Sequence, residues 1–82
     1  MALTRELLLA HLEQKLGVDT REVNEQTPLF TSGLIDSFSL VDLIMFIETS
    51  AGIRMETLDV SFENLDSIER ILRYVDSRTR GG

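Results

Sequence analysis

The chain has 82 residues, of which 43% are hydrophobic and 27% charged, and its formal net charge at pH 7 is −6. This length predicts one small globular domain, too small for a deep catalytic cleft. The longest apolar run, residues 43–47, is far shorter than the roughly 20 residues of a membrane-spanning helix. We therefore expect a soluble protein that does not act in a membrane.

Acidic residues are concentrated in the middle of the sequence. Residues 22–69 hold ten acidic and one basic side chain, a balance of −9, whereas the two ends hold four acidic and seven basic, a balance of +3. Such a field disfavours nucleic acids and anionic membranes and favours partner proteins with basic patches. A surface that only maintains solubility is the alternative. The chain shows no signal-peptide pattern and no cysteine, so we expect a cytoplasmic location.

The first predicted element is a helix over residues 5–16, with Thr4 suited to cap it and Gly17 to stop it. Leucines recur every four residues on one face, at Leu8, Leu12 and Leu16. A loop over residues 17–35 follows without a sustained period, and loops of such length are usually functional or disordered. Four apolar residues are expected to hold it on the core: Val18, Val23, Leu29 and Phe30.

The loop ends at Gly33-Leu34-Ile35-Asp36-Ser37-Phe38, directly before an apolar run of helical period. Asp36 is suited to accept hydrogen bonds from the first amides of the helix that follows. Ser37, on the first turn, is expected to point its hydroxyl outward at the corner between loop and helix. An isolated Asp-Ser pair is most often only a helix cap, so its meaning depends on the rest of the chain.

The helix that begins at Ser37 is predicted to reach Ala51 and to stop at Gly52. At ~100° per residue it carries two apolar strips. The core strip consists of Leu40, Leu43, Ile44, Ile47 and Ala51. The second strip consists of Phe38, Val41 and Met45, flanked by Asp42 and Glu48. This second strip either completes a wide core or forms a partner-docking face.

Residues 53–65 alternate between apolar and acidic side chains and predict a short helix or turn. Residues 66–69 then fit a capping box, with Asp66 as the cap and Glu69 three residues later. They open a last helix, whose buried stripe is expected to hold Ile68, Leu72 and Val75, with Ile71 beside it.

Other chemistries are excluded by missing residues. Asp59, Ser61 and Glu63 are spaced like the first ligands of a calcium loop, but Asn64 stands where that loop needs Gly. His11 is the only histidine, which excludes a Ser-His-Asp triad and a histidine-rich metal site. We expect His11 at the surface or the core boundary, and neither catalytic residues nor a metal site in this chain.

The segment Gly33–Phe38 resembles the phosphopantetheine attachment site of acyl and peptidyl carrier proteins: Gly, two variable residues, Asp-Ser and a large apolar residue. Phe38 stands where Leu is commoner. The resemblance covers about residues 3–76 and departs at the third helix, where many carriers have a proline and this chain has Glu56 or Thr57.

The resemblance implies an all-α fold, a small four-helix bundle with a long loop between helices one and two and a short third helix. We expect a single carrier domain over residues 1–82, with a core over about 3–76 and a flexible tail over 77–82.

The resemblance also implies a function. A phosphopantetheinyl transferase would use coenzyme A and magnesium to attach 4′-phosphopantetheine to Ser37, and Asp36 would help to present that serine. The thiol of the arm would then carry acyl or aminoacyl intermediates as thioesters in fatty acid, polyketide or nonribosomal-peptide-type biosynthesis. The chain would be a free-standing, monomeric acyl carrier protein and not an enzyme.

In this interpretation the second apolar strip and its two acidic flanking residues form a partner-binding face: Phe38, Val41, Asp42, Met45 and Glu48. The expected partners are the transferase, an acyl- or aminoacyl-loading ligase, and acyltransferases or synthases with basic patches. The cargo stays open. Phe46 is bulkier than the residue common at that place in fatty-acid carriers, which is a hint toward small or amino acid cargo.

Two other functions stay open. The C-terminal sequence Arg78-Thr79-Arg80-Gly81-Gly82 resembles the conjugating tail of ubiquitin-like modifiers, whose cores are rich in strands. Three helical periods and no sustained two-residue alternation argue against such a modifier. A purely structural helical adaptor would share the helices but would never be modified at Ser37.

Overall fold

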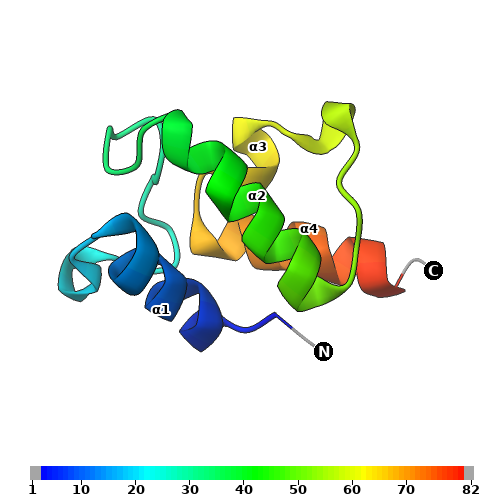
Figure 1. Ribbon diagram of the computed structural model, residues 1–82, viewed down its shortest axis with the longest axis horizontal. Helices are drawn as coiled ribbons and strands as arrows, with labels where there is room; N and C mark the ends of the chain where they lie inside the picture. The colour runs from blue at the N-terminus through cyan, green and yellow to red at the C-terminus, as the bar shows by residue number, and fades with distance from the viewer. Residues whose placement is uncertain (1–2, 81–82) are drawn as a thin grey trace.

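A computed structural model describes residues 3–80, except for the side chain of Arg80. These residues form four α-helices and two short 3-10 helices and contain no β-strand. The elements, in chain order, are α1 (Arg5–Leu16), η1 (Thr20–Glu22), α2 (Phe38–Ala51), η2 (Thr57–Asp59), α3 (Phe62–Leu65) and α4 (Ile68–Arg80). The expected all-α bundle with a long first loop and a short third helix is confirmed (Figure 1). Within the described residues, no helix is both long enough and apolar enough to cross a membrane.

α1 has the bounds that the sequence predicts because its end signals are local. The Thr4 hydroxyl oxygen accepts a hydrogen bond from the amide of Leu7 at 3.2 Å. Gly17 adopts a left-handed conformation with φ of 69°, and its amide donates to the Leu12 carbonyl oxygen. Leu8 and Leu12 lie on the buried face, as their spacing predicts.

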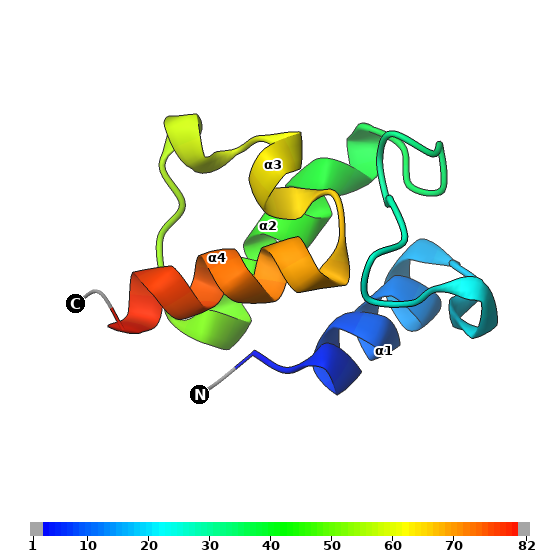
Figure 2. The ribbon, with the colours of Figure 1, turned by 180° about the vertical axis from the view of Figure 1, so that it is seen from behind.

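The core lies between α1, α2 and α4, and α2 crosses α4 in both views of the ribbon (Figure 1, Figure 2). Burial of large apolar side chains is the dominant favourable contribution to folding. The side chains with essentially no exposed surface are Leu8, Leu12, Leu29, Leu43, Ile47, Leu65, Ile68 and Ile71. Every α-helix and the first loop therefore contribute to one core.

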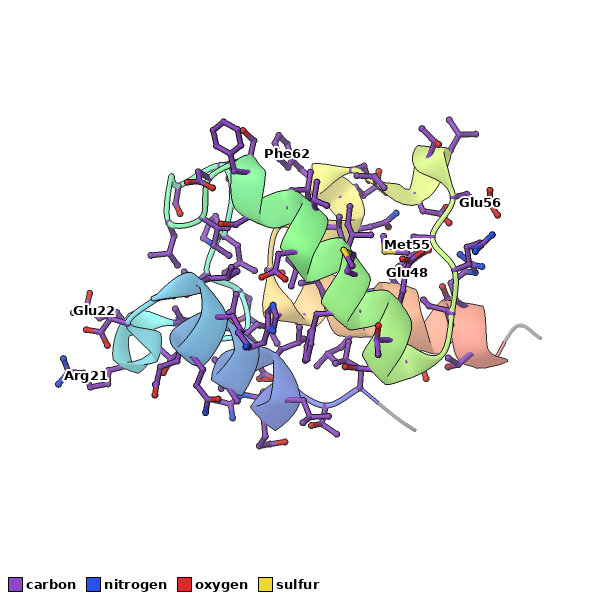
Figure 3. The ribbon with its side chains drawn as sticks, viewed as in Figure 1. Arg21, Glu22, Glu48, Met55, Glu56 and Phe62 are labelled. Atoms are coloured by element: carbon purple, nitrogen blue, oxygen red, sulfur yellow. The ribbon has the colours of Figure 1, made fainter. Side chains whose placement is uncertain are left out.

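The first loop is structured. Val18, Val23 and Leu29 are buried, as expected, and Phe30 is half-buried against the core. Its outer part is solvated: Arg21 and Glu22 of η1 point away from the bundle (Figure 3). The loop thus closes one end of the bundle with its apolar side chains and exposes its charged ones.

The start of α4 differs from the predicted capping box. Ser67 is the cap, because its Oγ accepts a hydrogen bond from the Arg70 amide at 3.1 Å. The Asp66 carboxylate turns instead toward the first loop and accepts hydrogen bonds from the amides of Phe30 and Thr31. The prediction of Asp66 as the cap is therefore wrong, because a loop distant in sequence engages the same carboxylate.

The end of α4 also differs from the expectation. Residues 77–80 are helical rather than a flexible tail, while Gly81 and Gly82 lie outside the described residues. The Arg78 guanidinium holds this last turn, since it donates to Asp59 Oδ2 at 2.9 Å and to the Tyr74 hydroxyl at 2.7 Å. Tyr74 joins the buried stripe of α4, whereas Leu72 is only half-buried.

Residues 53–65 form two short elements, η2 and α3, in place of one helix or turn. The Ser61 hydroxyl oxygen caps α3 by accepting from the Asn64 amide at 3.4 Å. The Tyr74 hydroxyl donates to Asp59 Oδ2 at 2.8 Å, which ties η2 to α4. That hydrogen bond is the main reason that the pKa of Asp59 lies below its usual value.

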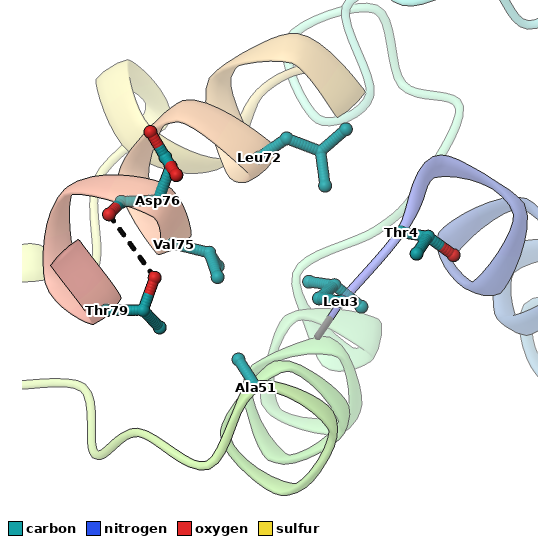
Figure 4. Close-up of a pocket in the computed structure, with 7 residues that line it drawn as sticks. All are labelled: Leu3, Thr4, Ala51, Leu72, Val75, Asp76 and Thr79. Atoms are coloured by element: carbon teal, nitrogen blue, oxygen red, sulfur yellow. Dashed lines mark hydrogen bonds between the residues drawn. The ribbon is translucent and has the colours of Figure 1, made fainter. Parts of the chain in front are cut away.

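A hollow of about 610 Å³ opens where α2 ends and the chain enters α1 (Figure 4). Its walls are formed by Leu3, Thr4, Ala51, Leu72, Val75, Asp76 and Thr79. Ala51 is the last residue of α2, whereas Ser37 directly precedes the first. The hollow is therefore separated from the Asp-Ser corner by the length of α2.

Candidate functional site

The Asp-Ser corner has the geometry that its sequence predicts. Ser37 precedes α2 with helical dihedral angles, φ −70° and ψ −19°. Asp36 makes the capping contact, because its Oδ1 accepts a hydrogen bond from the Ser39 amide at 3.0 Å. Ser37 makes no capping hydrogen bond through its side chain and is exposed. Capping thus falls to the aspartate, and the serine stays accessible.

This placement suits a serine that receives a phosphate group. An exposed hydroxyl is accessible to a second protein, and the positive end of the helix dipole favours the negative charge of a bound phosphate. α2 is 14 residues long, so its dipole is well developed. Ser37 thus fits a phosphodiester-linked group. In the described part of the chain, no three His, Cys, Asp or Glu side chains are grouped to hold a metal ion.

The residues before Asp36 form a tight turn. The Gly33 amide donates to the Phe30 carbonyl oxygen at 3.0 Å, and the Ile35 amide donates to the Leu29 carbonyl oxygen at 2.8 Å. Gly33 has a φ of 83°, which residues with a side chain rarely adopt. Ile35 is buried, so the chain is held on the core directly before the corner.

Asp66 fixes the start of this turn, and sequence reasoning missed that role. Its Oδ2 accepts from the Thr31 hydroxyl at 2.6 Å, and its Oδ1 accepts from the amides of Phe30 and Thr31. Burial raises the pKa of Asp66, but the hydrogen bonds from Thr31 and Phe30 and the charge of Arg70 outweigh burial and leave the pKa below its usual value. Asp66 therefore holds the loop as a charged carboxylate.

The second strip of α2 lies at the surface. Phe38, Val41 and Met45 are 91%, 62% and 60% exposed, whereas Leu43 and Ile47 on the core strip have no exposed surface. The interpretation of a wide core is therefore wrong. Exposed apolar side chains that gather on one face are typical of an interaction surface.

The two acidic residues that flank this strip differ in their surroundings. Asp42 is exposed, with its Oδ2 at 3.4 Å from His11 Nε2. Glu48 is half-buried, and its Oε2 accepts a hydrogen bond from the Met55 amide at 2.8 Å (Figure 3). Glu48 thus holds the segment after α2, and Asp42 is the more accessible charge.

A hollow of about 240 Å³ between α2 and α3 lies one helical turn from Ser37, and sequence reasoning did not find it. It is lined by Leu40, Val60, Ser61, Phe62 and Leu65. Phe62 is 57% exposed and stacks on Phe30, with ring centroids 6.1 Å apart. The apolar residues of the alternating segment 53–65 could have indicated a hollow. The sequence alone, however, does not show that this segment lies close to α2.

Phe46 lies elsewhere. Its ring stacks on the His11 imidazole with centroids 4.0 Å apart, on the side of α2 that faces α1. His11 is half-buried, at the boundary position that we expected. Phe46 does not line the hollow beside α3.

Comparison with known proteins matches the chain to carrier proteins. A family model described as a phosphopantetheine attachment site matches residues 6–75. The chain is 31% identical to the acyl carrier protein of Thermotoga maritima over 67 residues, 82% of this chain and 80% of that protein. It is 32% identical to the D-alanyl carrier protein of Enterococcus faecalis over 73 residues, 89% of this chain and 94% of that protein. No solved structure matches the chain significantly.

The ubiquitin-like alternative has no support, because residues 3–80 contain no strand and the family match covers most of the chain. The attachment-site match implies a phosphopantetheine prosthetic group. The chain therefore belongs to the carrier protein family defined by the phosphopantetheine attachment site, whose members carry acyl groups and are not catalysts.

Proposed function

We propose that this chain carries acyl or aminoacyl groups as thioesters on a 4′-phosphopantetheine arm esterified to Ser37, as a single carrier domain in the cytoplasm. The observation that carries the proposal is the corner itself. Asp36 takes the capping hydrogen bond at the start of α2 and leaves the Ser37 hydroxyl exposed.

Attachment forms one bond and breaks one. The Ser37 Oγ bonds to the phosphorus of coenzyme A that bears the pantetheine. The bond from that phosphorus to the bridging pyrophosphate oxygen breaks, and adenosine 3′,5′-bisphosphate leaves. The transferase would supply the base that takes the hydroxyl proton and would hold the magnesium ion that the reaction needs. When bound, phosphopantetheine supplies the thiol that this cysteine-free chain lacks.

Partner enzymes dock on the exposed strip of α2, made of Phe38, Val41 and Met45. Asp42 lies at its edge and adds a negative charge to a region that is acidic as a whole. Complementary charge speeds encounter and orients the partner, while apolar contacts supply affinity. The partners are a phosphopantetheinyl transferase, a loading ligase, and acyltransferases or synthases with basic patches.

The cargo is proposed as a class. One similar protein is named as an acyl carrier and the other as a D-alanyl carrier. Both names describe a carboxylic acid that can be held as a thioester. We therefore propose acyl or aminoacyl groups of fatty acid, polyketide or nonribosomal-peptide-type biosynthesis.

The test is an attachment assay read by intact mass. Incubation with coenzyme A, magnesium and a promiscuous phosphopantetheinyl transferase should add one phosphopantetheine per chain. Ser37→Ala should abolish the gain, whereas Ser39→Ala, a matched serine change two residues on, should keep it. A wild-type chain that gains no mass, or a Ser37→Ala chain that still does, would show that the proposal is wrong.

A further inference from the structure

Asp66 is a buried carboxylate that holds a loop from a distant part of the sequence. The residue is 8% exposed, and both of its carboxylate oxygens are engaged. Oδ1 accepts from the amides of Phe30 and Thr31 at 2.7 and 3.1 Å, and Oδ2 accepts from the Thr31 hydroxyl at 2.6 Å. The Leu29 amide donates to the Asp66 carbonyl oxygen at 2.7 Å. One residue therefore fixes loop residues 29–31.

Residues 29–31 are connected to Ser37 by a tight, hydrogen-bonded turn. The amides of Gly33 and Ile35 donate back to the carbonyl oxygens of Phe30 and Leu29. Ile35 is 4% exposed, and Asp36 and Ser37 follow it directly. Backbone hydrogen bonds therefore join residues 29 and 30 to the turn that ends at the corner.

We propose that Asp66 is a positioning residue for the modification of Ser37, acting through Phe30 and Thr31 to set where the serine hydroxyl stands relative to α2. The proposal rests on the proposed function, in which Ser37 receives phosphopantetheine. A transferase that docks on α2 must find the hydroxyl at a fixed place, and a misplacement of about 1 Å can cost a reaction roughly a hundredfold in rate.

The alternative is that Asp66 only stabilises the fold, and the chain contains a matched control for that role. Asp59 is also a carboxylate that joins distant segments, since it accepts hydrogen bonds from Tyr74 and Arg78. It ties η2 to α4, and none of the hydrogen bonds or ion pairs of its carboxylate involves residues 29–37. Loss of either carboxylate lowers stability, but only loss of Asp66 should affect the corner.

The experiment compares transfer kinetics of the wild type, Asp66→Ala and Asp59→Ala at a temperature where circular dichroism shows each to be folded. Coenzyme A, magnesium and a promiscuous transferase are the reagents. Asp66→Ala should lower kcat about tenfold or more with little change in KM, because the docking face is intact while the nucleophile is misplaced. Asp59→Ala should keep the kcat of the wild type. An unchanged kcat in folded Asp66→Ala would overturn the proposal.

Two smaller changes at Thr31 test the same contact if Asp66→Ala fails to fold. Thr31→Val removes only the hydrogen bond to Asp66 Oδ2, and Thr31→Ser keeps the hydroxyl. Thr31→Val should lower kcat, and Thr31→Ser should restore it. If both variants keep the kcat of the wild type, the hydrogen bond does not position the serine and the proposal is wrong.

Amide hydrogen exchange separates this proposal from the proposed function. Protection at Gly33 and Ile35 should fall in Asp66→Ala or Thr31→Val and persist in Asp59→Ala. A wild type that accepts no phosphopantetheine would refute the proposed function, and the exchange result would still decide whether Asp66 orders the corner. Unchanged protection in the Asp66 and Thr31 variants would overturn that role.

Discussion

On α2, Leu43 and Ile47 have no exposed surface, whereas Val41 and Met45, each two residues before one of them, are 62% and 60% exposed. All four side chains are apolar and of similar size. Their surroundings differ because successive helical residues turn by ~100°. The core strip stabilises the fold, while the outer strip is left in contact with solvent.

The comparison shows that hydrophobicity alone does not separate folding from function. A hydropathy average over the helix does not distinguish Met45 from Ile47, yet one faces solvent and the other the core. The difference in burial between the two strips can be tested, because a charged substitution should have a different effect on each strip. On the core strip it would prevent folding, and on the outer strip it should prevent docking.

The largest expected effect on stability is that of Ile47→Ala. Removing buried methyl and methylene groups at a site with no exposed surface leaves a cavity, and such changes cost about 2–5 kcal/mol. A small domain has only about 5–15 kcal/mol of total stability. Thermal and urea unfolding should therefore show a large loss. A cost within about ±0.5 kcal/mol, the range usual for surface changes, would mean that this strip is not the core.

Met45→Glu should leave stability nearly unchanged and reduce partner turnover. Surface changes usually lie within about ±0.5 kcal/mol, and a charge in the middle of an apolar docking face opposes desolvation. Melting and transfer rate measured on the same sample check both parts. Thr57→Glu, which adds the same charge on exposed η2, is the control and should keep transfer. If Met45→Glu destabilises the domain as much as Ile47→Ala does, both strips are buried.

Acid should weaken the attachment of the first loop to the core. The pKa of Asp66 in the folded protein lies below the value of about 3.9 expected when unfolded. The ionised carboxylate therefore contributes stability above the unfolded pKa, and this contribution is lost as pH falls through the folded pKa. Urea unfolding between about pH 6 and 3 should show stability falling with pH, less steeply in Asp66→Asn than in the wild type. Equal slopes would mean that Asp66 is not held as a carboxylate.

Asp42→Lys should have the smallest effect, a slower encounter with partners at low salt. Exposed charges act over about 10 Å at 0.1 M salt, so the difference from the wild type should shrink as salt rises. Glu6→Lys, a matched charge reversal on α1 outside the acidic region 22–69, is the control and should transfer normally. Glu48→Lys is a less suitable test, because it would also remove the hydrogen bond that the Glu48 carboxylate accepts from the Met55 amide. If the transfer rate depends neither on salt nor on charge reversal at Asp42, the acidic surface serves only solubility.

Features with local partners could be predicted from the sequence. The side chains of Thr4 and Asp36 each accept a hydrogen bond from the amide three residues further on. Gly17 and Gly52 end their helices in the left-handed conformation. In each case the partner lies within the next or preceding turn. The helical period likewise predicted the core strip of α2, because angular position on a helix decides which side chains face the core. Leu43, Ile47 and Ala51 of that strip are buried, and Leu40 and Ile44 are half-buried against the core.

Features with distant partners could not be predicted in this way. Asp66 has the sequence context of a cap but is engaged by Thr31, which lies 35 residues earlier. Tyr74 and Arg78 extend the order of α4 because they meet Asp59 on η2. A single sequence contains no information on which carboxylate a distant loop will approach. The corner was therefore predictable, and the contacts that hold it were not.

Fragmentation mass spectrometry of the protein isolated from the cells that make it is the most direct test of whether Ser37 is the attachment site. We expect one phosphopantetheine per chain, with the fragments placing it on Ser37. The arm should be found free or bearing an acyl or aminoacyl thioester, which would also identify the cargo. A chain without phosphopantetheine, or one that carries it on Ser32 or Ser39, would contradict the account.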